Sequence, residues 1–286
     1  MAKHTASATG IRTTPLPSGE TVPVLGQGTW GMAERADHRA DEIDALRTGI
    51  DLGMTLIDTA EMYAGGGAET LVAEALGERR DECFLVDKVM PQHATRRGTL
   101  DSCEASLRHL KTDRIDLYLL HWRGSVPLEE TLEAFDELVA AGKIRYWGVS
   151  NFDVDDMEEL AASKPEPPAT NQVLYNLTRR GVERGLIPLC RARGIPIMAY
   201  SPVEQGRLAK DRRLKTVANR LDVTPAQVAL ACVLHQEGII AIPKAGNFEH
   251  VRENRAALDL RLSPEDLADL DQIFPPPTKK VPLEML

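Results

Sequence analysis

The sequence is poor in cysteine and has no long apolar run. Its four cysteines, Cys83, Cys103, Cys190 and Cys232, form no C-x-x-C pair. This spacing argues against a disulfide framework and indicates a reducing, cytoplasmic environment. No apolar stretch approaches the roughly 18 residues of a membrane span, and the opening "MAKHTASATG" lacks the apolar core of a signal peptide. We therefore expect neither a signal peptide nor a membrane segment.

Basic charge and paired histidines are also scarce. The formal net charge is −9, which disfavours nucleic acid and anionic membranes as general partners. The seven histidines form no H-x-H or H-x-x-x-H pair, so a metal-dependent hydrolase fits poorly and no resident metal is expected. The expected partner is a small molecule. Nothing in the sequence demands more than a monomer, although a weak dimer is compatible with it.

Short apolar runs alternate with helical patterns along the whole chain. The pattern predicts one (β/α)8 TIM barrel over residues 1–286, preceded by a β-hairpin in residues 11–25 that turns at Ser18-Gly19. The expected strands cover 24–30, 55–60, 83–89, 115–122, 144–151, 170–175, 196–203 and 238–245. The expected helices cover 39–52, 69–79, 99–111, 128–141, 154–162, 180–193 and 225–236.

Single polar residues end most of the expected strands. In a (β/α)8 barrel the carboxyl ends of the strands meet at one mouth, where active sites lie. Residues that are distant in the sequence are therefore expected to share one pocket. They are Asp58, Lys88, His121, Ser150, Asn151, Gln172, Ser201 and Lys244.

Four of the residues near this mouth suit carbonyl reduction. A buried Lys88 needs a partner, and Asp58 is the natural one. The lysine cation is expected to lower the pKa of Tyr63, which could then donate a proton to a carbonyl oxygen as hydride reaches the carbon. His121 could orient the carbonyl. Taken singly, each residue also fits a structural role, as an ion pair, a core histidine or a packed tyrosine.

The strand ends lie within longer motifs that cover nearly the whole chain. These are "GQGTWGM", "DLGMTLIDTAEMYAGG", "FLVDKV", "DRIDLYLLHW", "IRYWGVSNF", "NQVLYN", "MAYSPVEQG", "IPKAGNFEHVREN" and the tail "FPPPTKKVPLEML". Together they resemble the aldo-keto reductases. The resemblance implies a barrel that reduces aldehydes and ketones with NAD(P)H. It places the catalytic tetrad at Asp58, Tyr63, Lys88 and His121, with Tyr63 as the general acid.

The resemblance also implies an NADPH site. Ser150, Asn151 and Gln172 would hold the nicotinamide carboxamide, and Tyr200 would stack on its ring. The remaining implied cofactor contacts are Thr29, Trp30, Asp58, Ser201, Pro202, Val203, Gln205, Gly206, Arg207, Lys244, Ala245, His250, Glu253 and Asn254. The expected substrate pocket consists of Trp30, Met62, Tyr63, Met90, His121 and Trp122. Such a pocket suits small or aryl aldehydes, 2-oxoaldehydes such as methylglyoxal, and keto-sugars.

Several positions depart from the family pattern. His250 replaces a frequent arginine and Ala245 a serine or threonine, so we expect NADP(H) use with weak discrimination against NADH. Asp87 stands where a small hydroxyl or apolar residue is usual, and alternation points it away from the barrel interior. The short segment after Phe274 is expected to leave the pocket open and the specificity broad.

Two alternatives remain open. The stretch from Gly26 to Gly31 is a literal G-x-G-x-x-G and could belong to a Rossmann dehydrogenase. Trp30 is bulky for a pyrophosphate loop, however, so we interpret the stretch as a first barrel strand in which Gly26 and Gly28 allow close packing. The second alternative is a non-catalytic barrel that binds NADPH and acts as a regulatory or redox-sensing subunit.

Overall fold

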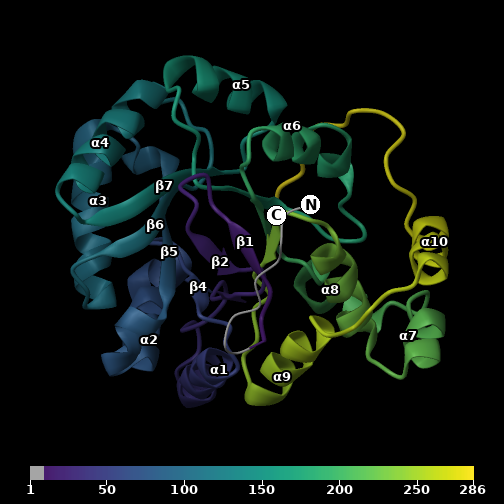
Figure 1. The fold of residues 1–286 in the computed structure, drawn as a ribbon. Coiled ribbons are helices and arrows are strands. Elements are labelled where there is room, and N and C mark those ends of the chain that lie inside the picture. Colours follow the sequence, from purple (N-terminus) through teal and green to yellow (C-terminus); the bar gives the residue numbers. More distant parts are fainter. Residues whose placement is uncertain (1–9) are drawn as a thin grey trace.

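Eight parallel strands form a barrel in the computed structural model, which describes residues 10–286 (Figure 1). Neighbouring strands follow the order of the sequence, and isolated parallel bridges from Leu25 to Ala241 and from Gly28 to Lys244 close the ring. The predicted (β/α)8 fold is thus confirmed. The strands are β3 (Gln27–Gly28), β4 (Leu56–Asp58), β5 (Phe84–Val89), β6 (Ile115–Leu120), β7 (Ile144–Ser150), β8 (Asn171–Leu174), β9 (Ile197–Tyr200) and β10 (Ile239–Ala241).

Two glycines make the closure of the barrel possible. The amide of Gly26 donates to the carbonyl of Ala241 at 2.9 Å. A Cβ atom at Gly26 would lie 2.7 Å from Leu56, and one at Gly28 would lie 2.7 Å from the Ile242 carbonyl oxygen. The expected close packing is confirmed. Because the motif belongs to a barrel strand, the Rossmann alternative is wrong.

Helices cover the outside of the barrel (Figure 1). The predicted helix over residues 180–193 is split, because Gly185 adopts a non-helical conformation between a short 3-10 turn and α6. Two helices, α7 (Lys215–Leu221) and α10 (Pro264–Ile273), were not predicted. The helices are α1 (Arg39–Asp51), α2 (Gly67–Leu76), α3 (Arg96–Leu110), α4 (Leu128–Ala140), α5 (Val154–Ser163), α6 (Leu186–Ala192), α7 (Lys215–Leu221), α8 (Pro225–His235), α9 (Phe248–Ala257) and α10 (Pro264–Ile273).

The predicted hairpin precedes the barrel and closes its floor. Strands β1 (Thr13–Pro15) and β2 (Thr21–Pro23) pair antiparallel, and Gly19 takes the turn at a φ of 87°. Leu16 and Val22 of the hairpin pack against the apolar side chains that fill the barrel. Figure 1 shows the purple hairpin across the middle of the molecule.

Alternation along the strands determines which residues reach the mouth. Leu56, Val86 and Leu119 fill the barrel interior, whereas Leu85 and Tyr118 pack against the helices. Two residues further along their strands, Asp58, Lys88 and His121 continue the inward series. Within residues 10–286, no helix is long and apolar enough to cross a membrane. The expectation about the first residues, "MAKHTASATG", falls almost wholly on residues 1–9, which lie outside the described residues.

Candidate active site

A cavity of about 690 Å³ lies at the carboxyl ends of the strands. Its volume suits a small-molecule or cofactor site. The predicted site residues that line it are Trp30, Asp58, Met62, Tyr63, His121, Trp122, Ser150, Asn151, Gln172, Tyr200, Ser201, Pro202, Val203, Gln205, Gly206, Lys244, His250, Glu253 and Asn254. The structure thus brings together residues as far apart in the sequence as Trp30 and Asn254.

Five predicted site residues do not line this cavity. Thr29 is buried and donates to the Asp58 carbonyl at 2.9 Å, and Lys88 lies beneath the cavity wall. The backbone N–H of Met90 donates to the carboxylate of Glu61 at 2.5 Å. The five predicted residues outside the cavity lining are Thr29, Lys88, Met90, Arg207 and Ala245. The contacts expected for Met90, Arg207 and Ala245 stay predictions.

Lys88 is the centre of a buried ion cluster under Tyr63. Its Nζ lies 2.8 Å from Asp58 Oδ2 and 2.6 Å from the Thr59 carbonyl oxygen. The same atom lies 3.4 Å from Tyr63 Oη and 5.0 Å from the centre of the tyrosine ring. Since Lys88 is fully buried, the carboxylate of Asp58 is what makes its charge tolerable.

The pKa shifts in this cluster follow from burial and from the pair. Burial opposes the charge on Lys88, but Asp58 and Tyr63 outweigh it and raise the pKa of Lys88. Burial also raises the pKa of Tyr63, although Lys88 counters that shift. The expected fall in the pKa of Tyr63 is therefore wrong for this structure, because lost hydration outweighs the ammonium 3.4 Å away. Tyr63 keeps its proton at neutral pH, as a proton donor must.

His121 is held neutral beside the tyrosine. Burial, with a contribution from Lys88, lowers the pKa of His121 to about 2. Its ring centre lies 6.0 Å from that of Tyr63 and 4.8 Å from that of Trp122. Among residues 10–286, nothing hydrogen-bonds its buried Nδ1. A neutral imidazole can offer one donor and one acceptor to a bound polar group.

Amide and hydroxyl groups form a second part of the cavity wall. Asn151 Nδ2 donates to the His121 carbonyl and to Ser150 Oγ, both at 3.1 Å. Tyr200 Oη donates to Asn151 Oδ1 at 3.1 Å. Gln172 Nε2 donates to Asp58 Oδ1 at 2.7 Å, which joins this network to the ion cluster. A group with both donors and acceptors, such as a carboxamide, matches these side chains.

The far end of the cavity suits an anion. Lys244 is exposed there, and α9 begins close by with Asn247 as its cap, accepting from the His250 amide at 2.9 Å. A helix N-terminus and a lysine both favour negative charge. In the sequence, Asn247 before "FEHVREN" is a residue typical of a helix N-cap, in agreement with the start of α9.

The loop after β9 forms another wall of the cavity. Ser201, Glu204 and Gln205 all have φ near 50°, a conformation that is rare outside glycine. Asn176 stabilises this loop, because its Nδ2 donates to the Ser201 carbonyl at 2.9 Å and to Glu204 Oε2 at 2.7 Å. Strained backbone that tertiary contacts hold in place is often found at ligand sites.

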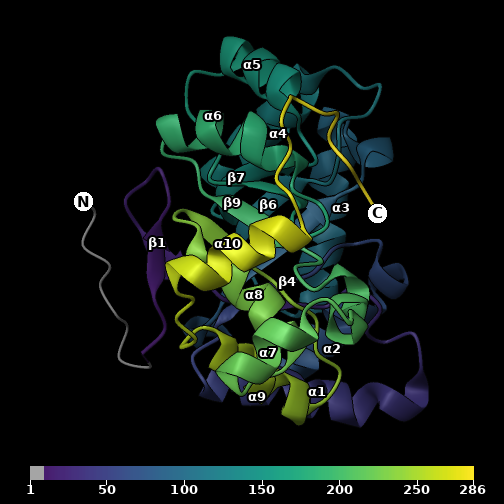
Figure 2. The same cartoon turned by 90° about the vertical axis from the view of Figure 1, so that its right-hand side faces the viewer.

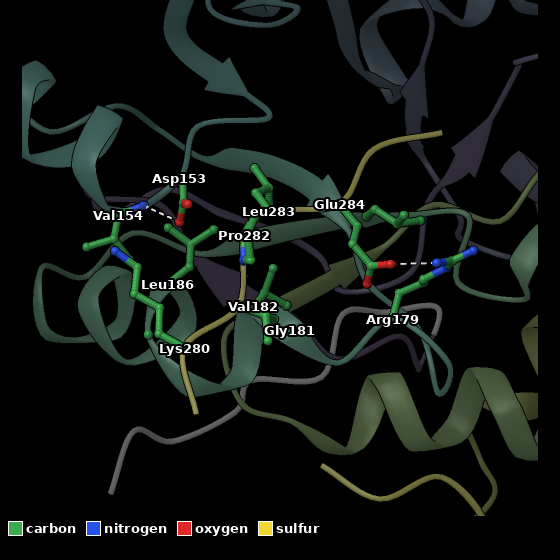
Figure 3. A pocket seen from close by; sticks show the side chains of 13 residues that line it. Asp153, Val154, Arg179, Gly181, Val182, Leu186, Lys280, Pro282, Leu283 and Glu284 are labelled. Atoms are coloured by element: carbon green, nitrogen blue, oxygen red, sulfur yellow. Dashed lines mark hydrogen bonds and ion pairs between the residues drawn. The ribbon is translucent and has the colours of Figure 1, made fainter. Parts of the chain in front are cut away.

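The segment after α10 reaches the cavity, contrary to the expectation of an open pocket. Figure 2 shows this yellow segment leaving α10 and running past other helices to its end. Figure 3 shows how residues 280–284 lie against the start of α5 and α6, with Glu284 paired to Arg179 at 2.5 Å. Met285 and Leu286 then border the cavity. The lining residues that the sequence did not indicate are Gly28, Gly31, Ala209, Ala226, Ile242, Gly246, Met285 and Leu286.

Within the part of the chain that the structure describes, no three His, Cys, Asp or Glu side chains are arranged to hold a metal ion.

Known proteins share both this sequence and this fold. The chain is 50% identical over 272 residues to methylglyoxal reductase YeaE of Escherichia coli, covering 93% of this chain and 96% of that protein. It is 32% identical over 261 residues to a glyoxal reductase of Bacillus subtilis, covering 91% and 92%. A crystal structure of an aldo-keto reductase from Klebsiella pneumoniae in complex with NADPH matches with a TM-score of 0.94 and 49% identity, covering 96% and 99%.

The family model agrees with these individual matches. The model of the aldo/keto reductase family matches residues 24–274, which is most of the chain. That span begins just after the hairpin and includes the whole barrel with every strand end that lines the cavity. The chain therefore belongs to the aldo/keto reductase family.

Proposed function

We propose that this chain reduces 2-oxoaldehydes such as methylglyoxal, together with other small and aryl aldehydes, using NADPH. The observation that carries the proposal is the buried Lys88–Asp58 pair directly beneath Tyr63 at the wall of the cavity. The related methylglyoxal and glyoxal reductases support the substrate class, and the related structure with NADPH supports the cofactor.

Each residue of the cluster has a separate task in the proposed reaction. When bound, NADPH supplies the hydride that reaches the carbonyl carbon. Tyr63, kept protonated by burial, donates its proton to the carbonyl oxygen as negative charge develops there. Lys88 then stabilises the phenolate that Tyr63 becomes, and Asp58 holds Lys88 in place. Neutral His121 orients the carbonyl without competing for the proton.

The cavity wall accounts for cofactor binding in this proposal. Ser150, Asn151 and Gln172 would hold the nicotinamide carboxamide, since they present amide and hydroxyl groups together. Tyr200 would stack on the nicotinamide ring. Lys244 and the N-terminus of α9 would bind the 2′-phosphate, with His250 beside them.

The substrate class is tested with a panel of carbonyl compounds. NADPH oxidation is followed with methylglyoxal, phenylglyoxal, nitrobenzaldehyde and keto-sugars at equal concentrations. We expect the 2-oxoaldehydes to have the highest kcat/KM. Equal or higher values for keto-sugars would contradict the proposed substrate class, and NADPH fluorescence quenching with no turnover on any compound would favour the non-catalytic barrel.

Removing the lysine at the far end should change cofactor preference. Lys244→Met is expected to raise KM for NADPH by about tenfold or more, because a charged hydrogen bond to phosphate is lost. KM for NADH should change less than about twofold, since NADH has no 2′-phosphate. Lys210→Met, at an exposed lysine that does not line the cavity, is the matched control. An equal rise for both cofactors would contradict the role of Lys244.

Strong discrimination between the cofactors is not expected in the wild type. His250 stands where an arginine would grip phosphate permanently, and imidazole carries charge only when protonated. KM values for NADPH and NADH, compared at about pH 6 and at about pH 8, should therefore favour NADPH only modestly. A strong preference for NADH at both pH values would contradict the proposed 2′-phosphate site.

The segment after α10 should influence carbonyl binding rather than chemistry. Glu284→Gln removes the ion pair between Glu284 and Arg179. The two side chains are 43% and 31% exposed, so the effect on substrate binding should be modest. We expect KM for phenylglyoxal to change by about threefold, with kcat and the Kd for NADPH unchanged. Glu265→Gln, at an exposed glutamate of α10, serves as control. An altered kcat with KM preserved would argue against this role.

We further propose that the protein acts in the cytoplasm and as a monomer. The four free cysteines, three of them buried, support a reducing compartment. Sedimentation at micromolar concentration would test the monomer directly.

A further inference from the structure

The side chain of Asp87 lies behind the active site, on the helix-facing side of β5. Because side chains alternate along a strand, Asp87 lies on the same face as Leu85 and Val89, which pack against the helices. Lys88 lies on the opposite face. The carboxyl group is fully buried. Its Oδ1 accepts the backbone N–H of Lys88 at 2.8 Å, so it contacts the strand at the residue that carries the ammonium.

A second buried carboxyl group faces Asp87. Glu69 of α2 is fully buried, and its side chain lies within hydrogen-bonding reach of Asp87. Asp87 Oδ2 and Glu69 Oε1 are both buried, and neither receives a hydrogen bond from any described residue. Two ionised carboxylates in this position would leave two buried acceptors unpaired and repelling each other. A single proton between the two oxygens removes both costs.

His109 of α3 connects this pair to the surface and to the turn that carries Tyr63. Its Nδ1 lies 2.8 Å from Glu69 Oε2, and its side chain is 48% exposed. The imidazole also packs on Gly66, where a Cβ atom would come within 2.6 Å of the ring. Gly66 ends the 3-10 turn Tyr63–Gly66. The pair therefore contacts both the backbone of Lys88 and the turn that places Tyr63.

The charges around Asp87 favour its neutral form. Burial and the adjacent Glu69 raise the pKa of Asp87 well above its usual range, and Lys88 opposes them only in part. Cys103 of α3, Tyr118 of β6 and Tyr63 also interact electrostatically with Asp87, and Cys103 and Tyr118 are buried. His109 is a basic side chain beside the pair, and its ring contacts Glu69.

We propose that Asp87 and Glu69 share one proton, and that this pair, with His109, positions Lys88 beneath Tyr63 for the reduction. Asp87 Oδ2–H donates to Glu69 Oε1 while Asp87 Oδ1 holds the amide of Lys88. Asp87 is thus a positioning residue. This role accounts for an aspartate at a position where the family usually has a small hydroxyl or apolar residue. The role in reduction rests on the proposed function, whereas the shared proton does not.

Unfolding as a function of pH tests the shared proton without any activity measurement. A carboxyl group whose folded pKa exceeds its unfolded pKa contributes its full stability at low pH and loses it as the pH rises. Asp87→Asn mimics the protonated form and cannot titrate. The Tm of this variant minus that of wild type should therefore increase steadily from about pH 5 to about pH 8. A constant difference would show that Asp87 is ionised in the folded protein and would overturn the proposal.

Kinetics test the positioning role. Asp87→Leu, which can neither accept from Lys88 nor donate to Glu69, should lower kcat by about tenfold or more. The Kd for NADPH should stay within about twofold, because Asp87 does not border the cavity. Asp87→Asn keeps both hydrogen bonds and should recover most of the lost kcat. Asp116→Asn is the matched control, since this buried aspartate of β6 pairs with Arg80 and Arg145 instead.

Two outcomes would overturn the positioning role. One is an Asp87→Leu variant with the kcat of wild type, and the other is an Asp87→Asn variant as slow as Asp87→Leu. If Asp87→Leu does not fold, the dependence of kcat on pH tests the role instead. The kcat of wild type should fall at alkaline pH, whereas that of Asp87→Asn should not fall over the same range. Matching pH profiles of kcat for the two proteins would contradict the positioning role. Absence of turnover in wild type would refute the proposed function alone, because the unfolding experiment still reports on the shared proton.

Discussion

Tyr63→Phe is expected to lower kcat for methylglyoxal reduction by about 10²- to 10⁴-fold. The variant removes only the hydroxyl group that lies 3.4 Å from Lys88 Nζ, which is the proton donor in the proposed reaction. The ring stays, and with it the packing against His121. The Kd for NADPH, measured by fluorescence quenching, should be close to that of wild type.

A matched control separates this effect from loss of any tyrosine hydroxyl. Tyr146→Phe removes a hydroxyl that donates to Glu20 at 2.6 Å, beneath the barrel and away from the cavity. Its kcat should match that of wild type. Turnover by Tyr63→Phe at the wild-type rate would remove the proton-donor role, and the proposed mechanism with it.

Lys88→Met should lose both turnover and stability. The variant leaves Asp58 buried without its ammonium partner, and breaking such a pair costs about 3–5 kcal/mol. The free energy of unfolding, from denaturant titration, should fall by that amount. Because no cation then stabilises the phenolate of Tyr63, kcat should also fall by about 10²-fold or more in the fraction that remains folded.

A double variant separates the two roles of this lysine. Lys88→Met combined with Asp58→Asn removes the unpaired charge, so much of the lost stability should return. Turnover should stay low, because the cation is still absent. If stability and kcat recovered together, the pair would be structural only. A Lys88→Met variant that folds and turns over like wild type would also contradict the account.

Much of the site could be predicted because it depends on local pattern. Period-two alternation and a polar residue at most strand ends place Asp58, Lys88 and His121 on one side of the sheet, whatever the distance between the strands in the sequence. The barrel assignment follows from the same regularity. The side to which a side chain points two residues before the end of a strand is therefore also the side to which the last side chain points.

The features of the site that could not be predicted depend on contacts between residues that are distant in the sequence. Arg179 and Glu284 are 105 positions apart, and only the folded barrel shows that their ion pair brings Met285 and Leu286 to the cavity. The direction of the pKa shift at Tyr63 depends on how much water the fold removes, which the sequence does not state. Likewise, Asp87 acquires a partner only when α2 packs Glu69 against β5.

The most direct test of the account is the transfer of deuterium from labelled NADPH to methylglyoxal. Cofactor in which deuterium replaces both hydrogens at the reactive carbon of the nicotinamide is mixed with wild type and substrate, and the alcohol is examined by mass spectrometry. We predict that each product molecule carries one deuterium on the reduced carbon, formed rapidly by wild type and very slowly by Tyr63→Phe. Bound cofactor that transfers no label to any carbonyl compound would contradict the assignment of this cavity as a reductase site.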